Sequence, residues 1–308
     1  MLFFVLRDII LTAFIWFIPK KSNLRGIKNI LFVEPLKQGY GDIFFQTGLF
    51  ENWKRDGYRV SILTTRGHAQ ILENNPNIDS IHIWSFRSRF QFIRGNCILV
   101  GLGRDTLRET LLMLFSLRAA VIVFDRDLKA WRDIFGKFGN TLAWQKLSEH
   151  YLGTKFYEYE PKIFFSTNEK ELIYSKRKHK RIGVIAGVED TSKSFEKTES
   201  LVHKINKRRN AVALLGKGNG AIRVSPKVIN FVNRLSYRET LIELASCHTA
   251  VGAEGSLIQI ASSLLKRVFV IDFEGRFEEN SHPNFLKNVK LFRSQSSENA
   301  IKNILNEL

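Results

Sequence analysis

The stretch Asn29–Lys54, NILFVEPLKQGYGDIFFQTGLFENWK, decides the fold of the chain. An apolar run rich in β-forming residues, Ile30–Val33, enters a loop with two glycines, and an amphipathic segment begins at Asp42. This order predicts a strand, a glycine loop and a helix. Because open α/β sheets place their ligands outside the carboxyl ends of parallel strands, we expect Asp42 to lie where the chemistry takes place.

The same pattern recurs along the chain. Apolar strands alternate with helices over 58–124 and again over 182–308, which predicts an α/β protein with two parallel sheets covered on both faces. An irregular polar connection separates the halves, and we place the domain boundary near Asn168. The basic run Lys176–Arg181 favours a solvated or linking surface, with an anion-binding patch as the alternative. Two such halves would face one another across a ligand-binding cleft.

Length and composition limit the class of protein. The chain has 308 residues, of which 44% are hydrophobic and 25% charged, so it is globular and long enough for two domains. With 47 Lys and Arg against 30 Asp and Glu, its net charge of +17 favours anionic partners: nucleic acid, acidic membrane or a phosphorylated small molecule. Cys97 and Cys247 stand in apolar stretches without metal-ligand spacing, which predicts buried thiols in a reducing compartment.

The amino-terminal segment, residues 1–22, is mostly apolar, with Arg7 and Asp8 as interruptions and basic residues from Lys20 onward. Its uncharged run is about half of the roughly 20 residues that a spanning helix needs, and it lacks the charge order of a signal peptide. We expect a helix in the membrane interface that holds the protein on the cytoplasmic face of the inner membrane through residues 1–21. A spanning helix and a helix buried against the protein are the alternatives.

Three loops at expected strand ends carry chemistry-bearing side chains. Asp42, after Gly39 and Gly41, suits a general base, with a helix-capping aspartate as the alternative. The loop Gly187–Lys193 offers hydroxyls, N–H groups and an ammonium to a phosphate, or is a solvated loop. The segment Val251–Ser256 begins a helix whose N–H groups suit a pyrophosphate, or is a plain strand-to-helix turn. The sequence shows no metal-ligand cluster and no Ser-His-Asp order.

From Ser22 onward the chain resembles glycosyltransferase family 9, the lipopolysaccharide heptosyltransferases. The family's motifs are found at Gly41-Asp42, at 75–79 (NPNID), at Lys193, at 214–216 (LLG), at 236–245 (SYRETLIELA) and in the donor loop 251–261. In that donor loop, Glu254 stands in place of the family's aspartate and Gln259 in place of its histidine.

The resemblance implies a GT-B fold of two Rossmann-like domains, an acceptor domain over 23–168 and a nucleotide-sugar donor domain over 169–308. It also implies an inverting reaction without metal or cofactor. Asp42 would be the catalytic base, with Gly39 and Gly41 on the acceptor side. The donor-binding residues that we predict are Gly187, Ser192, Lys193, Gly216, Leu235, Glu254, Gly255, Ser256 and Gln259.

We therefore predict a membrane-associated glycosyltransferase that moves heptose or another hexose-type sugar from a nucleotide sugar to a lipid-linked or lipopolysaccharide-type anionic acceptor. A non-catalytic, membrane-bound binding protein on the same scaffold is the alternative, favoured by Gln259. A nucleic-acid binder comes third. The basic and aromatic stretch Trp84–Arg94 permits it, but the basic residues form no recognised motif.

Overall fold

The structure is a computed structural model. It describes residues 27–34, 39–85, 98–101, 120–123, 148–149, 152–153, 160–186, 197–208, 211–217, 224–272, 275, 277–281, 283–293 and 296–308. The predicted membrane-associating helix at residues 1–22 lies outside these ranges. Within them, no helix is long and apolar enough to cross a membrane.

The chain packs as two compact units. The first comprises Met1–Gly39 and Phe45–Pro161, and the second comprises Tyr40–Phe44 and Lys162–Leu308. The first turn of one helix, Tyr40–Phe44, is therefore grouped with the second unit. The boundary expected near Asn168 falls inside that unit, in the first turn of the helix Thr167–Arg177.

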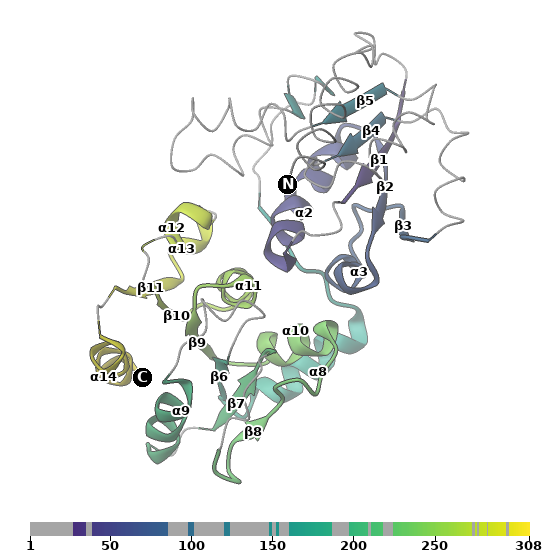
Figure 1. Ribbon diagram of the computed structural model, residues 1–308. Helices are drawn as coiled ribbons and strands as arrows, with labels where there is room; N and C mark the ends of the chain where they lie inside the picture. The colour runs from purple at the N-terminus through teal and green to yellow at the C-terminus, as the bar shows by residue number, and fades with distance from the viewer. Residues whose placement is uncertain are drawn as a thin grey trace, which may run out of the picture. The chain divides into compact units, whose positions relative to one another are not determined.

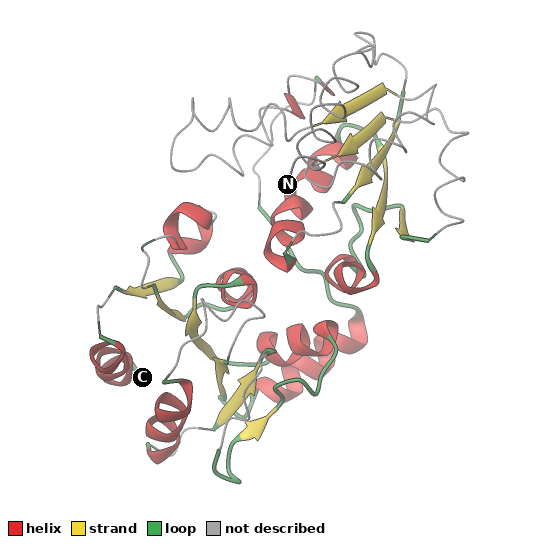
Figure 2. Cartoon of the chain, in the orientation of Figure 1, coloured by secondary structure: helices red, strands yellow, loops and turns green. Residues whose placement is uncertain are grey.

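The first unit is built on a five-stranded parallel sheet of order β3-β2-β1-β4-β5, as the sequence predicts (Figures 1 and 2). Strand β1 lies between β2 and β4, so the strand order reverses beside it, which is the position where such sheets bind ligands. Its described elements are β1 (Asn29–Val33), α2 (Tyr40–Arg55), β2 (Arg59–Thr64), α3 (Arg66–Leu72), β3 (Ser80–Ile83), β4 (Ile98–Gly101) and β5 (Ala120–Val123).

Aromatic packing fixes α2 on this sheet. Phe32 of β1 contacts Phe50 and Trp53 of α2, with ring centroids 5.4 and 6.1 Å apart, and all three side chains are buried. The indole N–H of Trp53 donates to Ser148 Oγ at 2.7 Å, which satisfies its only polar atom. The spacing of apolar residues that predicts this helix therefore also determines which of its faces is buried.

The second unit contains a six-stranded parallel sheet of order β11-β10-β9-β6-β7-β8. The predicted strands and helices of this half are present, and three short elements that the sequence did not indicate, α12, α13 and β11, extend it. The elements are α8 (Thr167–Arg177), β6 (Ile182–Ile185), α9 (Thr198–Lys207), β7 (Val212–Leu215), β8 (Ile229–Asn230), α10 (Tyr237–Ala245), β9 (Thr249–Ala253), α11 (Ser256–Leu264), β10 (Val268–Ile271), α12 (Phe277–Asn280), α13 (Pro283–Leu286), β11 (Val289–Phe292) and α14 (Ser297–Glu307).

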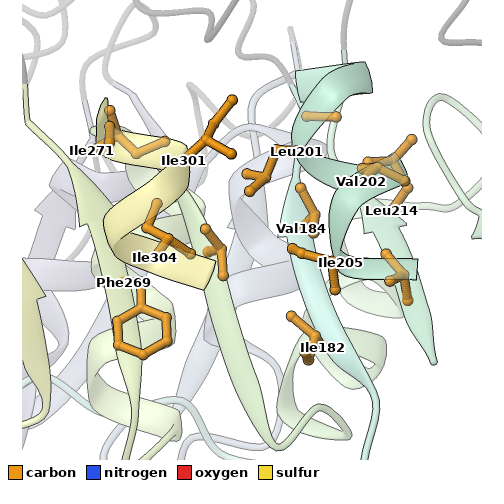
Figure 3. Packing of buried hydrophobic residues seen from close by; sticks show 14 of the residues in the cluster. Ile182, Val184, Leu201, Val202, Ile205, Leu214, Phe269, Ile271, Ile301 and Ile304 are labelled. Atoms are coloured by element: carbon orange, nitrogen blue, oxygen red, sulfur yellow. The ribbon is translucent and has the colours of Figure 1, made fainter. Parts of the chain in front are cut away.

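Helices α9 and α14 cover one face of this sheet (Figure 3). Leu201 and Ile205 of α9 and Ile301 of α14 are almost completely buried against strand residues such as Val184 and Phe269. Helices α10 and α11 lie on the opposite face (Figure 1). Each fully buried aliphatic side chain stabilises the fold by about 1.5–3 kcal/mol. This core therefore holds the strands whose carboxyl ends carry the predicted donor-binding loops.

The basic run at 176–181, for which the sequence favours a solvated or linking surface, is exposed at residues 177–180 and paired at both ends. Arg181 is buried, and its Nη2 lies 3.1 Å from Glu243 Oε2. Lys176 pairs with the same carboxylate, and Arg177 donates to the carbonyl of Ala245. These contacts tie α8 to the end of α10.

Candidate active site

Asp42 lies in the first turn of α2, which begins at Tyr40 rather than at Asp42 as the sequence suggested. The capping alternative is thus reduced to a favourable charge at the positive end of the helix. The carboxylate is exposed, whereas Gly41 beside it is buried. An exposed carboxylate at this position can meet a substrate hydroxyl, which a general base must do.

The start of α11 carries most of the predicted donor-binding residues that the structure describes. Strand β9 ends at Ala253, and Glu254, Gly255 and Ser256 are half-buried. Gly255 is the N-cap residue and provides no side chain to cap the first N–H groups of the helix, which are the groups that bind anions at helix starts. Gln259, one turn further on, is 9% exposed.

Gly41 brings these two helix starts together within the second unit. A Cβ atom at Gly41 would lie 2.6 Å from Gln259 Oε1 and 3.5 Å from Ser256 Cβ. Only a residue without a side chain permits this approach. Gly41, Ser256 and Gln259, predicted from separate motifs, are therefore neighbours, and Asp42 is the residue that follows Gly41 in α2.

A pair of tyrosines, which the sequence analysis did not single out, borders this group. Tyr40 and Tyr237, the first residues of α2 and α10, are stacked with ring centroids 3.8 Å apart and planes 10° apart. Burial raises the pKa of the Tyr237 hydroxyl above its usual value, and Ser256 lies beside that hydroxyl. No sequence motif indicates this contact, because the two residues are far apart in the chain.

The other predicted residues fall into two groups. Gly216 follows β7 with φ 117°, and its carbonyl accepts from the N–H of Asn233 at 3.1 Å, two residues before the half-buried Leu235. Both positions are near the carboxyl edge of the second sheet. Gly187, Ser192 and Lys193 lie outside the described residues, and their role in donor binding stays a prediction.

The carboxyl edge of the first sheet carries a second polar group that the sequence analysis missed. Glu34 follows β1 and is completely buried, and its Oε1 lies 2.5 Å from His68 Nδ1. Thr64, the last residue of β2, donates to Glu34 Oε2. A glutamate directly after an apolar strand was the available signal, but its partners come from other elements.

Two further features bear on cofactors and ligands. Among the described residues, no three His, Cys, Asp or Glu side chains are grouped so as to hold a metal ion. A cavity of about 540 Å³ lies along α9, bounded by 224–228 and Glu298, and none of the predicted site residues lines it. It is therefore distinct from the group around Asp42.

The arrangement of the chain matches known structures although its sequence matches little. No family model and no curated protein matches the sequence. Glycosyl transferase family 9 from Veillonella parvula superposes with a TM-score of 0.64 at 14% identity, over 91% of each chain. The ADP-heptose lipopolysaccharide heptosyltransferase II of E. coli superposes with a TM-score of 0.64 at 15% identity, over 91% of this chain and 97% of the other.

A third structure, E. coli heptosyltransferase WaaC with ADP-2-deoxy-2-fluoro heptose, superposes with a TM-score of 0.60 at 13% identity, over 91% of this chain and 99% of the other. The chain therefore has the α/β fold of the GT-B glycosyltransferases. Within that class it is similar to the structures of glycosyltransferase family 9, so the resemblance noted in the sequence is confirmed at the level of the fold.

Proposed function

We propose that the protein is an inverting, metal-independent glycosyltransferase that moves a sugar from a nucleotide sugar to a lipid-linked or lipopolysaccharide-type acceptor. One observation carries this proposal: Gly41 approaches Ser256 and Gln259 at the start of α11, and the exposed Asp42 is the next residue of α2. A base and an anion-binding helix start are the two parts that an inverting transfer requires.

In this mechanism the N–H groups at the start of α11 and the Ser256 hydroxyl hold the donor diphosphate, together with Lys193. Asp42 accepts the proton of the acceptor hydroxyl while the acceptor oxygen bonds to the anomeric carbon. The bond from that carbon to the phosphate oxygen breaks, and its electron pair leaves with the diphosphate. The helix start and the lysine stabilise the developing charge without a metal ion.

Gln259 has a definite place in this scheme. Its side chain is largely buried beside Gly41, so it acts as a neutral hydrogen-bonding group at the junction of the two helix starts. A glutamine cannot carry the positive charge of a protonated histidine, so more of the charge on the leaving diphosphate falls to Lys193 and the helix start.

We further propose that residues 1–21 hold the protein on the cytoplasmic face of the inner membrane. The net charge of +17 supports an acidic surface and an anionic acceptor as partners. The transferred sugar is heptose or a related hexose-type sugar.

The direct test is thermal stabilisation of detergent-purified protein by a panel of nucleoside diphosphates and nucleotide sugars, ADP-heptose included. A ligand at about 100 times its Kd adds about 2.7 kcal/mol to the free energy of unfolding. We expect one nucleotide sugar to raise the melting temperature, Lys193→Ala to abolish the shift, and Lys207→Ala, an exposed lysine of α9, to preserve it.

Gln259 also favours the second candidate, a binding protein without catalytic activity. That candidate predicts the same stabilisation but no release of nucleoside diphosphate when an acceptor is added. A folded protein that no nucleotide sugar stabilises would contradict the transferase.

A further inference from the structure

Tyr237, the first residue of α10, carries a buried hydroxyl that the described residues do not satisfy. Its side chain is 9% exposed. Ser256 lies beside the hydroxyl, although not in the geometry of a formed hydrogen bond, and no other described residue bonds to it. Because buried polar groups are almost always paired, an unpaired one indicates a functional role or a ligand that completes it.

The neighbour of this hydroxyl belongs to the predicted donor loop. Ser256 is the first residue of α11, directly after the N-cap Gly255, and it is half-buried. A serine hydroxyl has one proton to donate and two lone pairs that accept. If the phenol donates to Ser256 Oγ, the serine proton is left for an anionic oxygen at the helix start, where a charge-assisted hydrogen bond is strong.

The ring of Tyr237 has a second neighbour, in the turn that carries the proposed base. It stacks on Tyr40 at 3.8 Å, and Asp42 stands two residues after Tyr40 in α2. One turn beyond Tyr40, Phe44 packs against Phe285 with ring centroids 6.0 Å apart. These contacts all lie within the second unit, to which Tyr40–Phe44 belongs. The turn with Asp42 is therefore held on that unit by an aromatic contact on each side.

We propose that Tyr237 is a positioning residue with two functions: its hydroxyl orients Ser256 toward the donor diphosphate, and its ring holds Tyr40 and with it the turn of Asp42. The proposal rests on the proposed function. Tyr237 touches no reacting atom and acts through these two neighbours. Loss of the hydroxyl should therefore weaken donor binding, whereas loss of the stack should slow turnover.

The hydroxyl is tested by Tyr237→Phe, which keeps the ring. We expect the donor KM to rise about 5- to 20-fold and kcat to change by less than about threefold. The donor Kd from thermal titration should rise by the same factor without any turnover. In a Ser256→Ala background, Tyr237→Phe should add less than about twofold, because its effect passes through Ser256. An unchanged donor Kd, or additive losses in the double variant, would overturn this function.

Tyr58→Phe is the matched control. Tyr58 is also 9% exposed, and its hydroxyl donates to the carbonyl of Leu152 at 3.2 Å. It precedes β2, so it lies at the amino edge of the first sheet, away from the loops at strand ends. Tyr58→Phe should lower the melting temperature and leave the donor Kd and kcat within about twofold. A loss of affinity equal to that of Tyr237→Phe would show a general effect of stability and overturn the proposal.

The stack is tested at Tyr40. We expect Tyr40→Leu to lower kcat about 10- to 100-fold with the donor KM within about threefold, because misplacement of a reacting group by about 1 Å can cost about 100-fold in rate. Tyr40→Phe, which keeps the ring, should recover most of that loss. Amide hydrogen exchange over residues 41–46 should quicken in Tyr40→Leu but not in Tyr58→Phe. Unchanged exchange and kcat in Tyr40→Leu would overturn this function.

These measurements separate the inference from the proposed function. A folded protein that no nucleotide sugar stabilises contradicts the proposed function and the inference with it. A protein that binds its donor, loses turnover in Asp42→Asn, and keeps wild-type KM and kcat in Tyr237→Phe and Tyr40→Leu retains the proposed function and overturns the inference alone.

Discussion

Arg238 of α10 holds both carboxylate oxygens of Glu169 in α8, with its Nε 2.8 Å from Oε1 and its Nη2 2.7 Å from Oε2. The same carboxylate accepts from the N–H of Ser166 at 2.7 Å and completes a capping box. One glutamate therefore begins α8 and attaches it to α10, the helix that begins at Tyr237 beside the candidate site.

This contact makes stability depend on pH. Hydrogen bonds from Arg238, followed by those from Ser166, lower the pKa of Glu169 to about 2. The unfolded value is about 4.3, so the stabilisation is present above that pH and is lost as the pH falls toward 2. Glu169→Gln should lower the free energy of unfolding by about 1–3 kcal/mol at pH 7 and by clearly less at pH 3.

Urea titration at the two pH values measures this effect, with Glu171→Gln, an exposed glutamate on the same helix, as the control. An equal loss at both pH values would show that the carboxylate charge is not involved.

Cys247 should be chemically inert in the folded protein. It is 1% exposed, and burial raises the pKa of its thiol to about 12. In a Cys97→Ser background, reaction with a thiol reagent at pH 8 should be at least about 100-fold slower than in urea. Native labelling at the rate of a free cysteine would contradict the burial of this side chain.

Gly252 in β9 should not tolerate a larger residue. A Cβ atom there would lie 2.9 Å from Ile185 Cβ in the neighbouring strand, where neither backbone can yield easily. Gly252→Ala is expected to destabilise the protein by about 1–3 kcal/mol, as judged by thermal and urea unfolding. An unchanged midpoint would mean that the two strands separate more readily than their pairing suggests.

Gly41→Ala should affect stability less than Gly252→Ala does. The nearest atom is the mobile end of Gln259, which can rotate away, so we expect the free energy of unfolding to change by less than about 1 kcal/mol. Nucleotide-sugar affinity should fall because Gln259 is displaced, and the additional effect of Gly41→Ala should vanish in a Gln259→Ala background. If the losses of affinity were additive in the double variant, Gly41 and Gln259 would act independently, which would contradict this account.

Local patterns predicted most of the fold. The apolar run at 30–33 forms the expected strand, and the aromatic face of the helix after it packs on that strand. Ser256–Leu264 forms the helix expected. The short edge strand Val289–Phe292 gave no such signal, because a run of four residues is too short for its periodicity to be distinguished.

The site was partly predictable for a similar reason. Asp42 and the segment 254–259 lie at helix starts that follow strand ends, where sequence patterns indicate ligand sites. Tyr237, His68 and the burial of Arg181 depend on partners distant in sequence, and a single sequence does not reveal such pairings. To predict the contacts of Tyr237 and His68, one would have to know which elements pack against each other.

The central claim is that Asp42 is the base of a glycosyl transfer. The most direct measurement is the release of nucleoside diphosphate in the presence of donor and acceptor by wild-type protein, Asp42→Asn, and the control Asp79→Asn, whose carboxylate pairs with Lys54. We predict that Asp42→Asn loses about 100- to 10,000-fold in kcat, while donor-induced stabilisation stays that of wild type and Asp79→Asn remains active. Wild-type turnover by Asp42→Asn would contradict the claim.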